Sequence, residues 1–521
     1  MPTMKDLTSS VYTFSDLIRG NFLYVDKTEY IWEMIRPAKA MYFLSRPRRF
    51  GKSLTVSTLE AVFSGERELF KGLAIDTKDY DWKKYPVIHL DFGDIEAGSP
   101  QMFNESLSVR LTAIAKKAGI QLKAASAQGQ FRELILEISV QEPVVVLIDE
   151  YDKPILGNVG NAQVKEIQKV LKDFYSVIKA TESRQRFVFM TGVSKFAHVS
   201  VFSDLNNLLD ISQNPLYATM MGYGQEELET YFADRMERVC KEKDISQEKL
   251  LHELKQWYDG YRFHHASASV YNPVSIAQFF QNGGEFNNYW FSTGTPTFLL
   301  ELAKKTRFDF EKALTEPVSG LAFNSYELDN INTLALLLQT GYLTIKGAVR
   351  QFGSMFYYLD FPNLEVKSAF DVYLLGYYTK YNKEDIDELS VKLAQQVRGG
   401  DADGFMEILS VFFRKIPYDI HVRDEKYYQT IFFMLFLLIG IHIEAESRTN
   451  KGRIDAVASC GDWVYLFEFK LDQKAKIALN QIRGREYFGK YLHSGKQIVM
   501  IGVNFDSKTG EITDWQTEKL L

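Results

Sequence analysis

Three adjacent residues, Gly51, Lys52 and Ser53, have the types and the order that bind phosphate. They follow an apolar run at 40–44 and open a stretch whose apolar residues recur at helical spacing, which is the context of a P-loop. Phosphate binding needs backbone N–H groups at a helix N-terminus, a flexible ammonium group, and a hydroxyl group for Mg²⁺. The three residues supply all of these, so we predict a site for ATP and Mg²⁺.

The start of this loop departs from the usual P-loop pattern, GxxxxGK(S/T). Arg46 stands where the first glycine is expected, and Pro47, Arg48 and Arg49 follow it. In one interpretation these arginines contact nucleotide or DNA, with Arg49 as a nucleotide ligand; in the other they form a solvated cluster beside the loop. A chance helix start at Gly51 is the alternative for the tripeptide taken alone.

Two further apolar runs end in polar groups that would complete the site. The run at 144–148 ends in Asp149, which would hold the metal through water, and Glu150, which would orient the attacking water. The run at 186–190 ends in Thr191, whose hydroxyl group suits a polar sensor of the phosphates. This order of strands favours the P-loop interpretation and leaves open whether ATP is hydrolysed or only bound.

A second group of candidates lies near the C-terminus. The alternating runs at 453–459 and 463–470 flank a Gly-Asp turn, which predicts a β-hairpin. If that turn is the two-residue loop, Asp455 lies across from Glu468 with Cβ atoms about 5 Å apart. Lys470, two residues further on, shares their face. The opposite side is expected to hold the core residues Ile454, Ala456, Phe467 and Phe469.

Two facing carboxylates destabilise a sheet unless a positive group lies between them. Mg²⁺, or Mn²⁺ in its place, would be held by Asp455, Glu468 and a strand carbonyl, beside a water that Lys470 orients or deprotonates. Such a site hydrolyses phosphodiester bonds. Glu425, which opens the preceding helix, and Glu446, on the first strand, either face the same metal region or are solvated charges.

An ordinary surface hairpin is the alternative to a catalytic one. A Glu-x-Lys triplet is expected by chance in a long chain of which 25% is charged. In that interpretation Arg453 and Lys470 neutralise Asp455 and Glu468 without any metal. The geometry of the hairpin therefore carries more weight than the triplet.

The spacing of apolar residues indicates which elements position these groups. In residues 1–214 short β-rich runs alternate with helical stretches, which predicts a P-loop three-layer α/β/α ATPase domain with a mostly parallel sheet. Residues 215–361 are largely helical and predict a lid or adaptor region. Residues 362–521 predict a helical lead-in and an α/β domain of helix, three strands, helix and strand, with its core at about 421–505.

The middle region carries aromatic residues whose role has two interpretations. Trp257–Phe263 either packs on the ATPase domain or stacks on nucleic-acid bases. Within it, Arg262 either approaches the phosphates as a second sensor or forms a structural ion pair. His264 and His265 lack partners at metal-ligand spacing, which indicates a loop.

Length and composition exclude several classes of protein. The 521 residues suffice for about three to four domains, and two cysteines are too few for a disulfide framework, which favours the cytoplasm. The most apolar run, 431–441, is shorter than the roughly 20 residues of a membrane helix, so we expect no membrane contact. With a net charge of −6, any nucleic-acid contact must use a local basic patch.

These motifs resemble those of a bacterial family that joins an AAA-ATPase-like domain to a C-terminal PD-(D/E)xK nuclease domain. The resemblance covers nearly the whole chain and rests on Tyr24–Thr28, Ser45–Ser53, Leu147–Asp152, Met190–Phe196, Trp257–Phe263, Tyr271–Pro273, Tyr428, Gln429, Thr449–Asp455, Phe467–Lys470 and Tyr487. It implies a restriction-endonuclease-like fold and the same trio, Asp455, Glu468 and Lys470. It also implies Glu425, Glu446 and Gln481, which the motif places in the same site. The family's own loop is similar to Arg-Pro-Arg-Arg, so the missing glycine counts less against ATP binding.

The sequence therefore predicts an ATP-gated, Mg²⁺-dependent nuclease that acts on nucleic acid, with DNA as the expected substrate. The nucleotide state would set the lid, and the lid would control access to the nuclease site. The family resemblance implies a role in defence or in mobile-element biology. The alternative class is a nucleotide-dependent switch or binding protein whose nuclease-like domain recognises nucleic acid or a protein without cleavage. A homo-oligomer is compatible with both classes.

Overall fold

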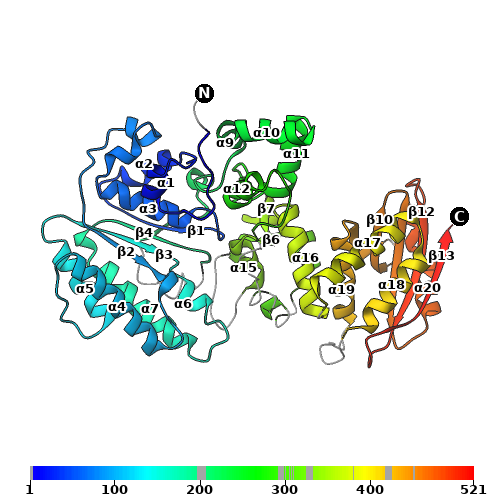
Figure 1. Ribbon diagram of the computed structural model, residues 1–521. Helices are drawn as coiled ribbons and strands as arrows, with labels where there is room; N and C mark the ends of the chain where they lie inside the picture. Colours follow the sequence, from blue (N-terminus) through cyan, green and yellow to red (C-terminus); the bar gives the residue numbers. More distant parts are fainter. Residues whose placement is uncertain are drawn as a thin grey trace. The chain divides into compact units, whose positions relative to one another are not determined.

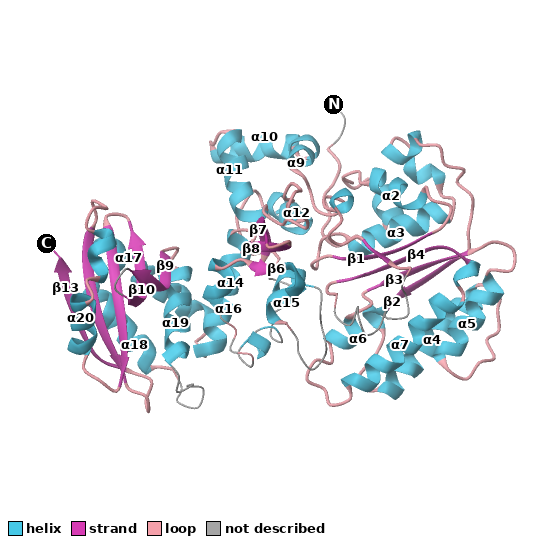
Figure 2. Cartoon of the chain, turned by 180° about the vertical axis from the view of Figure 1, so that it is seen from behind, coloured by secondary structure: helices cyan, strands magenta, loops and turns pink. Residues whose placement is uncertain are grey.

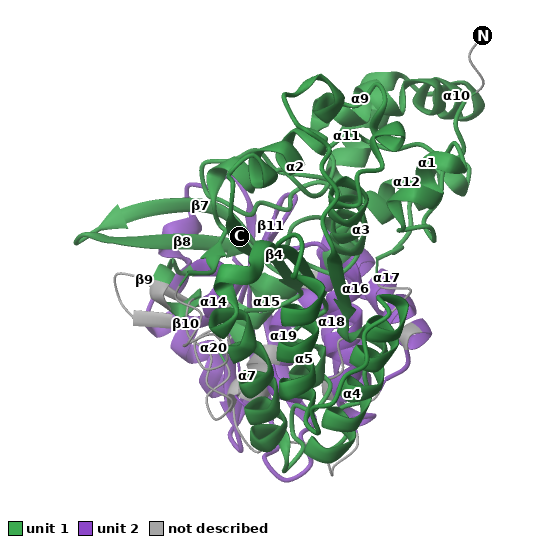
Figure 3. Cartoon of the chain, turned by 90° about the vertical axis from the view of Figure 1, so that its left-hand side faces the viewer, with its two compact units in different colours: residues 1–294, 316–366 green, residues 295–315, 367–521 purple. Residues whose placement is uncertain are grey.

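A computed structural model describes most of the chain, drawn in Figure 1. The described residues are 4–195, 207–290, 299, 301–303, 306, 308, 310–323, 332–379, 381–416, 425–449 and 452–520, with the backbone alone at 311, 321, 378, 383, 425–430, 437, 442–449 and 452–453. Phe196 and residues 450–451 of the motif segments lie outside them. The chain forms two compact units: unit 1 is 1–294 with 316–366, and unit 2 is 295–315 with 367–521 (Figure 3). The domain boundaries near 214 and 361 stay predictions.

Unit 1 is built on a five-stranded parallel sheet, as the alternating pattern predicts. Its strands, in spatial order, are β2 (Val87–Asp91), β3 (Val144–Asp149), β4 (Gln185–Gly192), β1 (Ala40–Ser45) and β5 (Leu209–Asp210). Because β1, β3 and β4 are buried on both faces, helices must cover both sides.

The covering helices form the two outer layers of this sheet (Figures 1 and 2). One layer contains α1 (Phe14–Arg19), α2 (Thr28–Ile35) and α3 (Lys52–Phe63), and the other contains α4 (Pro100–Lys117), α5 (Ala127–Ile138), α6 (Lys153–Leu156) and α7 (Val164–Ala180). The carboxyl ends of the parallel strands meet at one edge, where the ends of β3 and β4 and the loop from β1 to α3 carry the candidate ATP-site residues.

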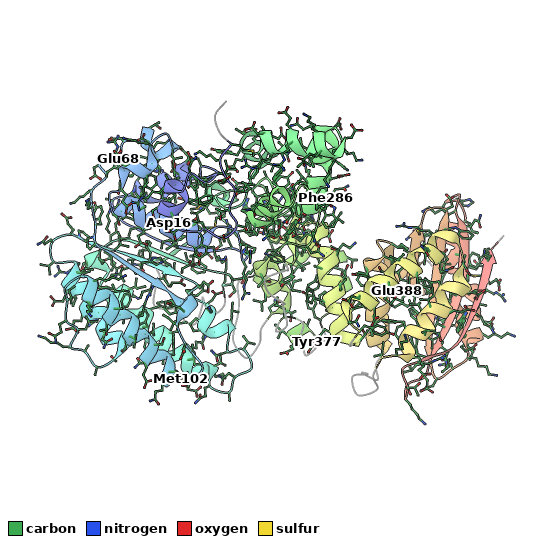
Figure 4. All side chains as sticks on the ribbon, in the orientation of Figure 1. Asp16, Glu68, Met102, Phe286, Tyr377 and Glu388 are labelled. Atoms are coloured by element: carbon green, nitrogen blue, oxygen red, sulfur yellow. The ribbon has the colours of Figure 1, made fainter. Side chains whose placement is uncertain are left out.

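A helical cluster follows in the same unit. It contains α9 (Gln225–Tyr231), α10 (Ala233–Lys243), α11 (Gln247–Tyr258) and α12 (Pro273–Gln281). Its core is aromatic: Phe286, labelled in Figure 4, packs against Tyr258 and Phe279 with ring centroids 5.9 and 4.7 Å away. Helices α9–α12 agree with the helical pattern predicted after the parallel sheet, and the lid or adaptor role of this region stays a prediction.

A small antiparallel sheet in this unit was not predicted. Its order is β6 (Val318–Ser319), β8 (Ser354–Asp360), β7 (Thr344–Gln351), and helix α15 (Thr333–Thr340) precedes β7. The pattern of β7 concealed it, because a glycine and two basic residues interrupt its apolar residues.

Unit 2 is a three-layer α/β/α structure. Its sheet, in spatial order, contains β13 (Ile512–Leu520), β12 (Gln497–Phe505), β11 (Trp463–Leu471), β10 (Gly452–Cys460) and β9 (His442–Thr449), and only the β11–β12 pair is parallel. The helices are α14 (Phe310–Thr315), α16 (Leu364–Thr379), α17 (Lys383–Gly399), α18 (Ala402–Arg414), α19 (Glu425–Leu438) and α20 (Ala475–Gly484). From α19 to β12 the order is helix, three strands, helix, strand, as predicted.

The two faces of this sheet are covered by different helices. Leu466 packs with Leu479 and Ile482 of α20, whereas its neighbour Phe467 packs against Phe432 of α19 and Phe405 of α18. Since successive strand residues point to opposite faces, β11 is enclosed on both sides. Helix α16 begins in unit 1 and continues from Lys367 in unit 2.

Within the described part of the chain, no helix has both the length and the apolar composition needed to span a membrane. Cys240 and Cys460 are both free thiols.

Candidate functional site

The loop between β1 and α3 has the backbone of an anion-binding loop. Gly51, directly before α3, has a φ of +89°, and Arg49 has a φ of +67°. A Cβ atom at Gly51 would meet nothing within 4 Å, so the left-handed backbone, and not crowding, requires glycine there. The chain thus turns to present the free N–H groups of the first turn of α3.

Lys52 is buried in this loop and is held by the loop's own backbone. Its Nζ donates hydrogen bonds to the carbonyl oxygens of Arg46 (3.2 Å) and Pro47 (3.0 Å). Burial lowers the pKa of Lys52, and Asp149 opposes that shift. The ammonium group must leave these carbonyl groups to reach a phosphate, so ligand binding and loop conformation are coupled.

Asp149 lies beside Ser53, and the two supply the oxygen donors that P-loop proteins use for Mg²⁺. Burial raises the pKa of the Asp149 carboxylate, and the nearby Ser53 hydroxyl group opposes that shift. Glu150 follows with a φ of +50° and has an ion pair with Lys153 at 3.6 Å. A left-handed glutamate is strained, and such strain concentrates at functional sites. These residues fit a magnesium–nucleotide complex.

Thr191 lies within the sheet at the end of β4. It is fully buried, and its hydroxyl group donates to the carbonyl oxygen of Leu44 at 2.8 Å. The hydroxyl group therefore already has a partner on β1, and its role as a phosphate sensor stays a prediction.

Asp152 is a polar residue of this edge whose position the sequence did not reveal. It is 2% exposed, and its carboxylate accepts hydrogen bonds from the Ser194 backbone and hydroxyl group, both at 2.7 Å, and from the Val193 backbone at 3.3 Å. Burial raises its pKa. Asp152 thus ties the loop after β3 to the loop after β4. The available signal was a carboxylate three residues after Asp149 in a short Tyr-Asp-Lys-Pro stretch.

Arg46 follows neither interpretation of the arginine cluster. Its guanidinium group is buried and donates to the carbonyl oxygens of Ser212 (2.7 Å) and Tyr217 (3.0 Å), and it lies over the Phe263 ring at 4.1 Å. Burial lowers the pKa of Arg46 to about 9. The bulky residue at the first glycine position therefore anchors the segment after β5. Partial burial also lowers the pKa of Arg49, whose nucleotide role stays a prediction.

The aromatic segment Trp257–Phe263 packs on the P-loop. Tyr261 and Phe263 meet the Phe50 ring edge to face, with centroids 4.8 and 5.5 Å away. This confirms the packing interpretation over a base-stacking platform. Arg262 forms no ion pair with any described residue; its guanidinium group donates to the backbone of Lys346 at 3.2 Å.

The C-terminal hairpin has the predicted register. Ala456 pairs with Phe467 and Val457 with Leu466, around a two-residue turn. The ladder begins at the turn and ends at the pair Ala456 and Phe467, and Asp455 and Glu468 are the next residues on their strands. The Asp455 carboxylate accepts the backbone N–H of Phe469 at 2.7 Å, so a side chain replaces the ladder where the strands separate.

One core prediction is wrong because of this separation. Phe467 and Phe469 pack against Phe432 on the side of α19, as expected. Ile454, however, belongs to the cluster around Leu466 on the side of α20. Once β10 leaves the ladder, the strict alternation of faces no longer holds.

Glu468 is the most constrained group of this site. It is 1% exposed, and burial, followed by the charge of Asp455, raises its pKa to about 7. Its Oε1 accepts hydrogen bonds from Lys470 Nζ (3.0 Å) and Gln481 Nε2. Its Oε2 is buried and has no hydrogen-bond partner among the described residues. One oxygen is therefore held in place by two donors, while the other has none among the described residues.

A divalent cation fits this donor set. Asp455 and Glu468 supply two carboxylates, and Mg²⁺ completes its octahedron with water and substrate oxygens when protein ligands are few. No cluster of three or more His, Cys, Asp or Glu ligands occurs in the described part of the chain. The structure brings together Asp455, Glu468, Lys470 and Gln481, from β10, β11 and α20.

The side chains of the two remaining candidates, Glu425 and Glu446, fall outside the described residues, and only their backbone is described. Glu425 is the first residue of α19. Glu446 lies on β9 between Ala445 and Ser447, which pair with Ala456 and Ile454 of β10, so the backbone brings position 446 opposite position 455. Their metal roles stay predictions.

Comparison with known proteins agrees with this architecture. Residues 9–202 match the family model described as "Predicted AAA-ATPase", and residues 423–515 match that of the "PD-(D/E)XK nuclease superfamily". The chain therefore belongs to the family that joins these two domains, and together they support a nucleotide-dependent nuclease. Over 530 residues it is 36% identical to "Uncharacterized protein in vnfD 5'region" of Azotobacter chroococcum mcd 1, and the match covers 99% of each chain.

Proposed function

We propose that this protein is an ATP-gated, Mg²⁺-dependent nuclease that cleaves DNA. The nuclease activity is supported by the environment of the buried Glu468 carboxylate. One oxygen accepts hydrogen bonds from Lys470 and Gln481, and the other has no partner among the described residues. An unpaired buried acceptor is unfavourable, and a bound cation would satisfy it.

The residues of the site divide the work of phosphodiester hydrolysis. Asp455 and Glu468 would hold Mg²⁺, which when bound polarises the phosphate and lowers the pKa of a coordinated water. Lys470 orients that water and offsets the negative charge that builds up on the phosphate. Gln481 fixes the carboxylate of Glu468, and Glu425 and Glu446 are further ligand candidates. A fixed set of donors needs little reorganisation during the reaction.

Gating is supported by a chain of hydrogen bonds that leads from the P-loop to α16. The indole N–H of Trp290 donates to the carbonyl oxygen of Arg48 at 3.2 Å, and its backbone N–H donates to Glu365 at 2.8 Å. Ser275 donates to the other oxygen of Glu365 at 2.8 Å. Glu365 is the second residue of α16, whose later turns belong to unit 2.

ATP binding would disturb this chain at its first link. Lys52 holds the carbonyl groups of Arg46 and Pro47, next to the Arg48 carbonyl that Trp290 holds. When Lys52 turns to the phosphates, these carbonyl groups lose their donor and the loop must adjust. Trp290 and Glu365 would carry that adjustment to α16. A gate requires an element with two states that the ligand biases, and the P-loop backbone is our candidate.

The test is cleavage of plasmid DNA and of a labelled oligonucleotide with Mg²⁺, with and without ATP. We expect Lys470→Ala to abolish cleavage and retain ATP binding, and Lys52→Ala to remove ATP binding and the effect of ATP on cleavage. Wild-type cleavage by Lys470→Ala would refute the assignment of the site. Binding of DNA without any cleavage by the wild type would favour the nucleotide-dependent switch instead.

A further inference from the structure

The β7–β8 hairpin of unit 1 ends in an unusual turn. The ladder runs to the pair Gln351 and Ser354, so Phe352 and Gly353 form a two-residue loop. Both have positive φ values, 49° and 81°, as a type I′ turn requires. Asn-Gly is a preferred pair for this turn, and a bulky side chain with positive φ is strained. Phe352 is thus a poor choice for the turn itself.

Phe352 also contributes nothing to packing within the described structure. Its side chain is fully exposed, and Arg350, Gln351, Gly353 and Ser354 around it are exposed as well. The third strand, β6, reaches only Phe356 and Tyr357 of β8. Beyond them β7 and β8 form a two-stranded ribbon that extends past the helices of unit 1 (Figure 3).

The ribbon is basic, although the chain as a whole is acidic. The hairpin residues 344–360 contain two basic residues, Lys346 and Arg350, and one acidic residue, Asp360, which pairs with Thr344 at the end of the ladder away from the turn; the net charge of the whole chain is −6. The Lys346 ammonium group is engaged by the carbonyl oxygen of Pro362 at 3.0 Å. Arg350 is exposed, and no ion pair links it to the residues that the structure describes. The free positive charge of the ribbon is therefore two residues from the exposed ring.

We infer that the tip of the β7–β8 ribbon binds nucleic acid, with the Phe352 ring against a base and the Arg350 guanidinium group on a backbone phosphate. An exposed aromatic ring beside a cation is complementary to a polyanion whose repeating units carry flat apolar faces. Apolar side chains of this kind stack on unpaired bases or wedge between base pairs. The inference rests on the proposed function for its ligand class, and it gives the ATPase unit a substrate contact of its own.

The test uses full-length Lys470→Ala protein, which the proposed function expects to bind DNA without cutting it, with a fluorescein-labelled 30-nucleotide strand and its duplex. Phe352→Asn creates the favoured Asn-Gly turn, so we expect it to fold at least as well as its parent by thermal denaturation. We expect it to bind DNA about tenfold more weakly, because loss of one stacked base is worth roughly 1–3 kcal/mol. Tyr12→Asn, which removes an aromatic ring that is 66% exposed, is the matched control and should bind like the parent.

Arg350→Gln separates the phosphate contact from the ring contact. The slope of log K against log salt is negative, and loss of one phosphate contact makes it less steep by about 0.9 on duplex DNA and about 0.7 on a single strand. The probe that loses more affinity in Phe352→Asn shows whether the ring meets paired or unpaired bases.

The inference is overturned if Phe352→Asn folds normally and binds both probes like its parent, or if it changes self-association alone. Its failure differs from failure of the proposed function. If the wild type cleaves DNA and Phe352→Asn binds DNA like its parent, only the proposed ribbon contact is refuted. If Phe352→Asn loses DNA binding but the wild type never cleaves DNA, the ribbon contact is supported and the proposed nuclease activity is refuted.

Discussion

Replacing Glu468 with Gln is expected to stabilise unit 2 at neutral pH, although it removes a residue of the proposed nuclease site. Burial and the charge of Asp455 raise the pKa of Glu468 from 4.5 to about 7 in the folded chain. In the unfolded chain the carboxyl group ionises near 4.5, so between these values the native state retains a proton that the unfolded state has lost. The stability of wild-type unit 2 therefore falls as the pH rises from 4.5 to about 7, and it levels off above that pH.

The size of this effect follows from the difference between the two pKa values. A change from 4.5 to about 7 corresponds to roughly 3 kcal/mol of unfolding free energy. Screening by solvent is small because Glu468 is 1% exposed. Glutamine stays neutral, and the weaker hydrogen bond that it accepts from Lys470 subtracts about 1 kcal/mol. Above pH 7 we thus expect Glu468→Gln to exceed the wild type by about 2 kcal/mol.

The assay is guanidinium unfolding of the full-length chain without divalent metal, from pH 4.5 to 8. Two of the six tryptophans, Trp463 and Trp515, lie in unit 2, and the part of the fluorescence change that differs between wild type and Glu468→Gln follows its unfolding. Glu388→Gln is the control, because its carboxylate is an exposed surface group on α17 (Figure 4) with 68% of its side chain exposed. Addition of Mg²⁺ above pH 7 should stabilise the wild type and not Glu468→Gln, because the ion replaces the missing partner of the carboxylate.

Parallel pH profiles for wild type and Glu468→Gln would refute this reasoning, since they would mean that Glu468 ionises normally in the folded chain. If the stability of wild type and Glu468→Gln diverges between pH 4.5 and about 7 but Mg²⁺ has no effect, the raised pKa of Glu468 is supported and the metal site is refuted.

Two further predictions concern the ATP site. Trp290→Phe keeps an aromatic side chain but removes the hydrogen bond to the Arg48 carbonyl. That bond is worth about 1 kcal/mol, so we expect roughly fivefold weaker ATP binding by isothermal titration and a smaller effect of ATP on cleavage. Unchanged values for both would exclude Trp290 from the gate. Gly51→Ala places a side chain at a φ of +89°, which costs roughly 1–2 kcal/mol, and we expect it to lose ATP binding. Because a Cβ atom there meets no neighbour, this loss would come from the backbone conformation alone. Gly51→Asn should retain more ATP binding, since asparagine tolerates this conformation better than alanine.

The local geometry of the two candidate sites could be predicted because their decisive signals are local. Gly51, Lys52 and Ser53 are consecutive, and a strand before them and a helix after them suffice to place a phosphate loop. The partners Asp455 and Glu468 are 13 residues apart, and a two-residue turn determines the pairing of the strands between them. Periodicity and turn chemistry therefore carry this information without knowledge of the rest of the fold.

Other features depend on residues that are far apart in the chain. The sequence predicted either contact with nucleotide or DNA or a solvated cluster for Arg46, but the segment at 212–217 folds over it and supplies its acceptors. The partners Trp290 and Glu365 are 75 residues apart, and neither has a local pattern that indicates the other. The ribbon that carries Phe352 was concealed because one glycine and two basic residues interrupt the apolar residues of β7, and the pairing of β8 with both β7 and β6 reveals the sheet.

The sequence by itself thus determined the local geometry of the candidate sites: a loop between a strand and a helix with Gly51, Lys52 and Ser53, and a hairpin with two acidic residues and a lysine. The tertiary structure alone decided which buried polar groups are satisfied, that Glu468 has one oxygen left over, and that Trp290 joins the P-loop to the start of α16. The physical reason is that hydrogen bonds and turns between near neighbours follow from local geometry, whereas burial, and the pKa shifts that burial causes, arise only when distant segments pack together.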